Sequence, residues 1–203
     1  IEGNIDLFPF LSINHKIKKI DIRTGNYMID KDLIIPKNYK FIIQPGVKIE
    51  LNKSANIISY SPIEFNGTIT NPIKIESSDS TGQSITILNV AEESILNYVY
   101  FNNLSSLSKS GKSLTGSVNI YESNVIISNC IFTNNNSEDA LNVIRSNFLI
   151  KNTKFENIKS DAFDSDYSNG EILNSEFINC GNDGIDISGS LVTLNNVVIS
   201  FIG

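Results

Sequence analysis

Asp139-Ala-Leu-Asn-Val-Ile-Arg-Ser146 is the stretch of sequence that decides the fold, because it recurs twice at a fixed interval. The second copy is Asp161-Ala-Phe-Asp-Ser-Asp-Tyr-Ser168 and the third is Asp183-Gly-Ile-Asp-Ile-Ser-Gly-Ser190, each 22 residues after the last. An internal period of roughly 20–50 residues indicates a repeat architecture in which each unit stacks on the next. A unit of this length holds about three short strands, but not a strand and a typical helix. We therefore predict a β-solenoid with one triangular coil per unit.

A second element recurs between these copies, an asparagine followed three residues later by phenylalanine or isoleucine. It begins at Asn129, Asn152, Asn174 and Asn196. In stacked coils the apolar members would form a buried column, and the asparagines would form a column at a turn, where side-chain amides bond to one another and to turn backbone. A looser coil comes earlier and consists of Asn97-Tyr-Val-Tyr100 and then Ser117-Val-Asn-Ile-Tyr-Glu-Ser123.

The composition supports an all-β fold in a single domain. The 203 residues include 34 Ile, 28 Asn and 26 Ser against 4 Ala. β-Branched residues favour strands, Asn and Ser favour turns, and Ala is the best helix former, so an all-helical fold is strongly disfavoured. We expect one domain over residues 1–203, with an N-terminal cap and first coils in 1–53, an exposed loop in 104–116 and regular 22-residue coils in 117–203. The pattern continues up to the last residue, so we expect a fragment of a longer protein.

The coil length and the asparagine column resemble those of the right-handed parallel β-helix, the pectin-lyase-like group. Residues 25–50, with a Pro turn and a Pro-Gly turn, resemble the opening coils of that fold, and residues 60–75 resemble the next. The resemblance implies about seven or eight coils. The chain is also similar to β-helix segments of bacterial surface proteins, including those near CotH-like kinase domains, although it has no kinase-like motif. This similarity implies an exported, extracellular or cell-surface protein whose partner is a polysaccharide or a cell-envelope component.

The charge distribution excludes some partners. The net charge of −6 argues against DNA or RNA, because nucleic-acid binding normally needs a basic surface. Residues 1–53 carry 9 basic and 6 acidic side chains, whereas residues 137–203 carry 4 and 10. No stretch approaches the roughly 20 apolar residues of a membrane span, so we expect no membrane span in this segment. Cys130 and Cys180 lack the spacing of a metal site, and we expect both to be small buried hydrophobes.

Acidic residues of the last third fall on one face of the predicted coils. Strand alternation points the apolar members of the repeat inward and their polar neighbours outward. The outward column consists of Asn142, Asp164 and Asp186, and a column beside it consists of Asp139, Asp161 and Asp183. Coils stack about 4.8 Å apart, where two like charges repel by about 1 kcal/mol even in water. Some feature of the protein should offset this repulsion.

Three explanations remain open. A hard cation such as Ca²⁺ would be held by oxygen ligands, for which we predict Asp161, Asp164, Asp183 and Asp186. Alternatively, one carboxyl of a pair has a raised pKa and serves as a general acid. The third explanation is that the side chains are splayed, hydrated and screened by salt. The predicted ligand-binding residues are Asn142, Asp164, Asp186 and Tyr167, the last of which would stack on a sugar ring.

Two function classes follow. The first is a non-catalytic module that binds glycan or acts as a structural or adhesive spine, with an acidic, Ca²⁺-binding lateral face. The second is a Ca²⁺-dependent polysaccharide lyase or, with less support, a glycoside hydrolase. Lyases of this fold would need a basic residue to remove a proton. The candidates are Arg145, Lys151, Lys154 and Lys159, and their spacing does not identify any one of them as the base.

The hydrolase reading rests on one motif. Asn182-Asp-Gly-Ile-Asp186 resembles the Asn-x-Asp-Gly motif of polygalacturonase-type hydrolases, but the histidine that accompanies it there is absent, since the sole histidine, His15, lies far away. No catalytic residue can be assigned. The absence of a histidine or a clearly placed base beside the acidic cluster favours binding over catalysis.

Overall fold

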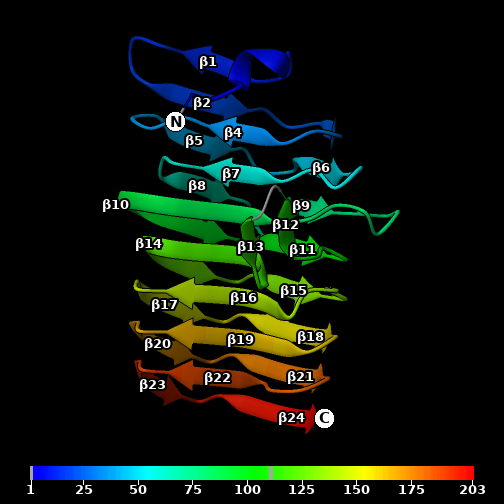
Figure 1. Cartoon of the computed structure of the whole chain (residues 1–203), viewed down its shortest axis with the longest axis vertical. Coiled ribbons are helices and arrows are strands. Elements are labelled where there is room, and N and C mark those ends of the chain that lie inside the picture. Colours follow the sequence, from blue (N-terminus) through cyan, green and yellow to red (C-terminus); the bar gives the residue numbers. More distant parts are fainter. Residues whose placement is uncertain (1, 110–111) are drawn as a thin grey trace.

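The computed structural model describes residues 2–109 and 112–203, whose strands stack into a parallel β-solenoid of about eight turns (Figure 1). Strand makes up 59% of the chain and helix 2%, and successive turns lie about 23 residues apart. The predicted all-β solenoid is therefore confirmed. Because each coil buries its apolar side chains between three short strands, the core runs as a continuous column along the stack.

Each coil contributes short strands that pair with the coils before and after it. The N-terminal coils contain the 3-10 helix η1 (Ile5–Leu7) and strands β1 (Ser12–Asn14), β2 (Lys19–Ile22), β3 (Asn26–Ile29), β4 (Leu33–Ile35), β5 (Lys40–Ile43) and β6 (Lys48–Leu51). The middle coils contain β7 (Ile57–Ser59), β8 (Ile63–Asn66), β9 (Ile73–Glu76), β10 (Ile85–Asn97), β11 (Val99–Asn102), β12 (Leu107–Lys109), β13 (Lys112–Leu114), β14 (Gly116–Ser128) and β15 (Ile131–Thr133). The C-terminal coils contain β16 (Asp139–Ile144), β17 (Asn147–Lys151), β18 (Lys154–Ile158), β19 (Asp161–Asp166), β20 (Asn169–Leu173), β21 (Glu176–Cys180), β22 (Ile185–Ser188), β23 (Leu191–Asn195) and β24 (Val198–Ile202).

The repeat sets the register between coils. β16, β19 and β22 pair in parallel, so Leu141 lies opposite Phe163, and Phe163 opposite Ile185. Their polar neighbours are aligned in the same way, with Asn142 opposite Asp164 and Asp164 opposite Asp186. The two columns predicted from the 22-residue repeat are therefore present in this register.

Left-handed residues form the corners of the coils. The corner between β16 and β17 is Arg145 and the matching corner one coil later is Tyr167, with φ angles of +49° and +50°. A serine follows each of them and links successive coils: the backbone N–H of Ser146 donates to Oγ of Ser168 at 3.1 Å, and that of Ser168 donates to Oγ of Ser190 at 2.8 Å. These serines satisfy backbone groups that the turn removes from the strand ladder.

The predicted asparagine column occupies the next corner. Asn129 donates to the side-chain oxygen of Asn97 at 2.9 Å, and Asn196 donates to that of Asn174 at 2.8 Å. In the earlier coil Asn97 pairs with Ser128, and Tyr98 takes the left-handed corner with φ +50°. Asparagine tolerates this conformation better than most residues, which explains the recurrence of Asn at this turn.

A second asparagine column, absent from the prediction, lies at the third corner. Its members share a positive φ and recur in successive coils, namely Asn103, Asn134, Asn157 and Asn179. Asn179 donates to the side-chain oxygen of Asn157 at 2.7 Å, and Asn134 donates to that of Asn102 at 3.0 Å. The interval of 22 residues between Asn157 and Asn179 is the sequence signal that could have revealed this column.

Phenylalanine rings form a stacked column inside the solenoid. The ring centroids of Phe101, Phe132, Phe155 and Phe177 are separated in turn by 4.8, 4.5 and 4.7 Å. All four side chains are fully buried. Cys130 and Cys180 are free thiols and are buried, as expected, and burial raises the pKa of Cys130 to about 12.

The exposed loop expected at residues 104–116 is instead partly folded and partly buried. β12 and β13 pair antiparallel as a hairpin, and Leu104 and Leu107 are buried. Residues 110–111 of the expected loop lie outside the described residues. The polar composition of the segment concealed two leucines three residues apart, which anchor it to the solenoid. Its last residues reach the acidic face, where the hydroxyl of Thr115 accepts a hydrogen bond from Asn142.

We expect Phe155→Ala to destabilise the protein by about 3–5 kcal/mol, because it removes a ring from the middle of the stack and leaves a cavity. Denaturant unfolding followed by circular dichroism measures the change. The matched control is Phe201→Ala, whose side chain is 81% exposed and which should change stability by less than about 0.5 kcal/mol. Equal effects of the two substitutions would show that the ring column does not stabilise the fold.

Candidate metal centre

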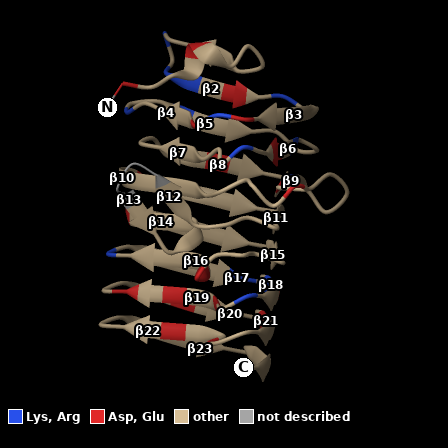
Figure 2. Ribbon diagram, turned by 45° about the vertical axis from the view of Figure 1, so that its right-hand side comes forward, with Lys and Arg blue, Asp and Glu red and all other residues tan. Residues whose placement is uncertain are grey.

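Acidic residues of the last coils lie in the neighbouring strands β19 and β22 (Figure 2), and Asp139 opens the adjacent strand β16. Asp161 opens β19, and Asp183 lies at the same place one coil later, two residues before β22. Parallel pairing stacks the starts of these strands directly over one another, so their carboxylates share one side of the solenoid.

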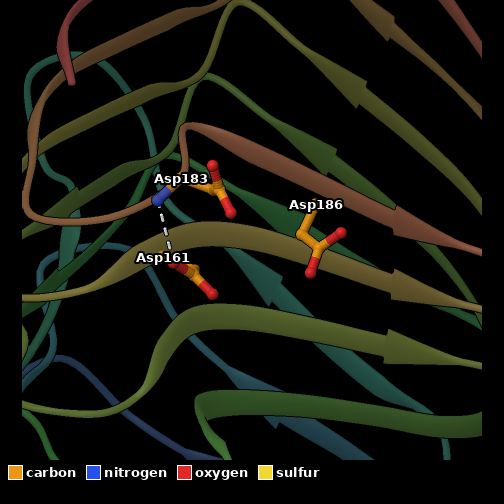
Figure 3. A group of neighbouring side chains, drawn as sticks. All are labelled: Asp161, Asp183 and Asp186. Carbon is orange, nitrogen blue, oxygen red and sulfur yellow. Dashed lines mark hydrogen bonds between the residues drawn. The ribbon is translucent and has the colours of Figure 1, made fainter. Parts of the chain in front are cut away.

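Three of the aspartates form a compact group, which we call the acidic triad: Asp161, Asp183 and Asp186. Carboxylate oxygens of the three lie within 4.8 Å of one another (Figure 3). Asp161 is 9% exposed, whereas the other two are open to solvent. The group therefore has a buried side toward the solenoid and an open side toward solvent.

Hydrogen bonds fix Asp161 through one of its two oxygens. Its Oδ1 accepts the backbone N–H of Asp183 at 2.9 Å and the side-chain amide of Asn182 at 2.7 Å. Within the described ranges, no hydrogen bond reaches its Oδ2, and no ion pair involves any member of the acidic triad. The sequence analysis named Asn182 only as part of the hydrolase-like motif and did not predict its hydrogen bond to Asp161. The triad thus presents oriented oxygen ligands and no cationic partner.

Asp164, the fourth predicted metal ligand, lies beside this group but bonds elsewhere. The amide nitrogen of Asn142 donates to Oδ2 of Asp164 and to Oδ2 of Asp139, both at 2.9 Å. The same nitrogen lies 2.8 Å from the hydroxyl of Thr115. Asn142 thus holds two carboxylates that would otherwise repel each other.

Asn142 lies in the predicted column but is covered, whereas we predicted that it would face a ligand. It is 2% exposed, because residues at the end of the 104–116 segment cover the first part of the column. Its side-chain oxygen is buried and has no hydrogen-bond partner within the described residues. An unpaired oxygen in this position adds to the excess of acceptors around the acidic triad.

The crowded carboxylates shift the titration of the half-buried Asp164. Burial raises the pKa of Asp164 to about 7, and the negative charges of Asp139, Asp166, Asp186 and Asp161 act in the same direction. Burial also raises the pKa of Asp139. Near neutral pH, Asp164 therefore exchanges a proton readily, and a cation bound nearby would favour its charged form.

Tyr167 lies apart from the acidic triad. It is 68% exposed at the corner that follows β19, three residues and about 10 Å along the strand from Asp164. Its ring lies over Gly189 of the next coil, where a Cβ atom would come within 2.8 Å of Tyr167 Cδ1. The predicted ligand-binding residues therefore do not form one site. Asn142 is buried, Asp164 and Asp186 lie on the acidic face, and Tyr167 lies at a separate corner.

Two of the four basic candidates for a lyase mechanism, Lys154 and Arg145, contact other side chains. Lys154 pairs with Glu156 at 2.6 Å, and that partner raises the pKa of Lys154. Arg145 lies 3.0 Å from the hydroxyl of Tyr121 and 3.5 Å from Glu122. A lysine that removes protons needs a lowered pKa, whereas the pKa of Lys154 is raised.

Comparison of the chain with protein-family models, with curated proteins and with solved structures finds no match. The class of protein is therefore defined by the fold, a parallel β-solenoid. Among the described residues, no helix has the length and apolar character needed to cross a membrane.

Replacing Asp164 with Asn should change how stability depends on pH. Because the folded-state pKa of Asp164 is raised to about 7 from 3.8, the native protein binds more protons than the unfolded chain between these values. Wild-type stability therefore falls, through this group, as pH rises from about 4 to about 7, and this loss is complete above pH 7. We expect Asp164→Asn to be more stable than the wild type at pH 8 and equal to it near pH 4, as measured by urea unfolding.

The control variant is Glu171→Gln, which removes an exposed charge outside the acidic face. Its effect should be small at both pH values. A wild type that exceeds Asp164→Asn in stability at pH 8 would contradict the raised pKa.

Proposed function

We propose that the chain is a non-catalytic, extracytoplasmic β-solenoid module whose acidic face binds Ca²⁺ and, through the ion, a polysaccharide that carries carboxylates. The observation that carries the proposal is the convergence of the acidic triad, whose oxygens lie within 4.8 Å of one another. The rigid stack of coils would serve at the same time as a spine that displays this face.

The donor set suits a hard cation. Ca²⁺ takes about 6–8 oxygen ligands and accepts flexible geometry, and three carboxylates supply up to six oxygens. Asp161 is already oriented by hydrogen bonds to Oδ1, so its Oδ2 can bind an ion with little further loss of conformational freedom. A bound cation would also offset the repulsion among the stacked aspartates.

The open side of the acidic triad favours a polymeric ligand. Asp183 and Asp186 are exposed, so an ion held there would keep coordination positions directed to solvent. A uronate carboxylate of an acidic polysaccharide could occupy these positions. The resemblance of the coils to the pectin-lyase-like group, and to β-helix segments of bacterial surface proteins, supports a glycan partner and an exported location.

Binding is favoured over catalysis by the state of the basic side chains. A lyase would need a base beside the ion, whereas Lys154 is held protonated by Glu156 and Arg145 is directed to Tyr121 and Glu122. The only histidine, His15, lies near β1 at the opposite end of the stack. We therefore expect the module to hold its polysaccharide without cleaving it.

Calcium should raise the melting temperature of the wild type and have no effect on Asp183→Asn/Asp186→Asn. At a Ca²⁺ concentration of about 100 times Kd, the gain is about 2.7 kcal/mol. The double variant removes the two exposed ligands and keeps Asp161, which has a structural role. The control is Glu171→Gln/Glu176→Gln, which removes two exposed charges from other faces and should respond to Ca²⁺ as the wild type does.

Calorimetry with polygalacturonate then tests the partner. We expect binding by the calcium-loaded wild type, and none after chelation or by Asp183→Asn/Asp186→Asn. The absence of both binding heat and a melting shift with Ca²⁺ alone would contradict the metal centre. The appearance of unsaturated sugar products would show that the protein is a lyase and not a non-catalytic binding module.

A further inference from the structure

A hollow of about 500 Å³ lies at the other end of the solenoid, at the corner that Tyr167 occupies in a later coil. Four successive turns surround it: residues 16–18 before β2, residues 36–39 before β5, residues 60–62 before β8, and residues 89–92 within β10. The last of these turns is longer than its counterparts in later coils and forms one wall. We call the hollow the lysine–tyrosine pocket.

Positive charge dominates this pocket. Lys18, Lys37 and Lys40 line it, against a single acidic side chain, Glu92. Lys40 is paired with Glu64 at 3.2 Å, but neither Lys18 nor Lys37 has a carboxylate partner in the described part of the chain. Two ammonium groups are therefore available to an anion in a protein whose net charge is −6.

Two tyrosines give the pocket flat, partly apolar surfaces. The ammonium of Lys18 lies 5.0 Å from the ring centroid of Tyr39, and the hydroxyl of Tyr39 lies 2.8 Å from Nδ1 of His15. These two contacts hold the ring in place beside the pocket. Tyr60 also lines the pocket, and within the described ranges its hydroxyl has no hydrogen-bond partner. It is free to donate to, or accept from, a ligand.

Apolar side chains complete the lining. Ile17 is 64% exposed beside the pocket, and Pro62 and Val90 also contribute to its surface. A small inorganic anion would use the lysines alone and leave the rings and apolar side chains in water. A ligand that uses all of these groups has an apolar face for the rings, hydroxyls for Tyr60 and a negative charge for the lysines.

We infer that the lysine–tyrosine pocket binds an anionic sugar residue of a polysaccharide, without a metal ion. The sugar lies against Tyr39, Tyr60 and the apolar lining, and its carboxylate or sulfate lies between Lys18 and Lys37. An extended nucleic acid is disfavoured, because only Lys18, Lys37 and Lys40 supply positive charge in this pocket and the protein has a net charge of −6.

The pocket is separate from the acidic triad. Five strand pairings lie between β5 and β19, which is about 24 Å at about 4.8 Å per step. The inference therefore does not rest on the calcium site, and each of the two can fail alone. If both hold, they would give one acidic polysaccharide two points of attachment, and the combined affinity would exceed that of either point.

The experiment is calorimetric titration of the whole chain with tetragalacturonate in the presence of a chelator, which silences any metal site. We expect Lys18→Gln/Lys37→Gln to bind at least tenfold more weakly than the wild type, and wild-type binding to weaken as salt is raised. The matched control is Lys74→Gln/Lys151→Gln, which removes two lysines from other faces and should leave the affinity unchanged. Circular dichroism of each variant checks that the fold is retained.

Three outcomes would overturn the inference. The first is the absence of wild-type binding in chelator, and the second is equal binding by Lys18→Gln/Lys37→Gln. The third is binding of the neutral oligosaccharide, with its carboxylates reduced to alcohols, or of inorganic phosphate with the affinity of tetragalacturonate. We expect both to bind at least tenfold more weakly. Phosphate binding of equal strength would leave an anion site with no preference for sugar. Tyr39→Ala should weaken tetragalacturonate binding without altering any response to phosphate.

Discussion

Parallel backbone pairing between coils is the constraint on which the rest of the structure depends. It places each position of the repeat about 4.8 Å from the same position one coil later, so every side chain has a chemical relative as its neighbour. For phenylalanine and asparagine this is favourable, since rings stack and amides bond to amides. For aspartate it is unfavourable, and Asn142 relieves it on only one side by bridging Asp139 and Asp164. In the acidic triad, Asn182 donates to Asp161 at 2.7 Å and to Asp183 at 3.5 Å, and among the described residues no amide bonds to Asp186.

The repeat explains why the fold was predictable and parts of the site were not. A 22-residue period requires that Leu141, Phe163 and Ile185 share a column, and the strand register agrees. Where the period is interrupted, the repeat no longer predicts which residues of successive coils align. In the looser coil before residue 117, the corner residue is Tyr98, and Asn97 pairs with Ser128. Residue type alone does not identify such a corner, because Arg145 and Tyr167 are left-handed as well as the recurring asparagines.

The burial of Asn142 illustrates a different limit. Alternation correctly predicts which way a strand residue points, but it cannot show what covers the outer surface of the coil. Here the cover is the end of the 104–116 segment, whose Thr115 contacts Asn142. That segment has a polar composition and lies outside the repeat, so its two buried leucines carried no periodic signal. Asp183 and Asp186, which lie two coils beyond Asn142, remain exposed.

A solenoid also keeps distant parts of the sequence distant in space, with consequences for charge. In a globular fold the basic first third and the acidic last third would meet, and their charges would largely neutralise one another. Here each coil contacts only its neighbours, so the excess of basic residues in 1–53 stays in the first coils and the excess of acidic residues in 137–203 stays in the last coils. If both proposed sites hold, the two regions would bind the same anionic polymer by different means, directly through ammonium groups and indirectly through a cation. The acidic net charge of the chain is thus compatible with an acidic partner, because the fold prevents the charges from averaging.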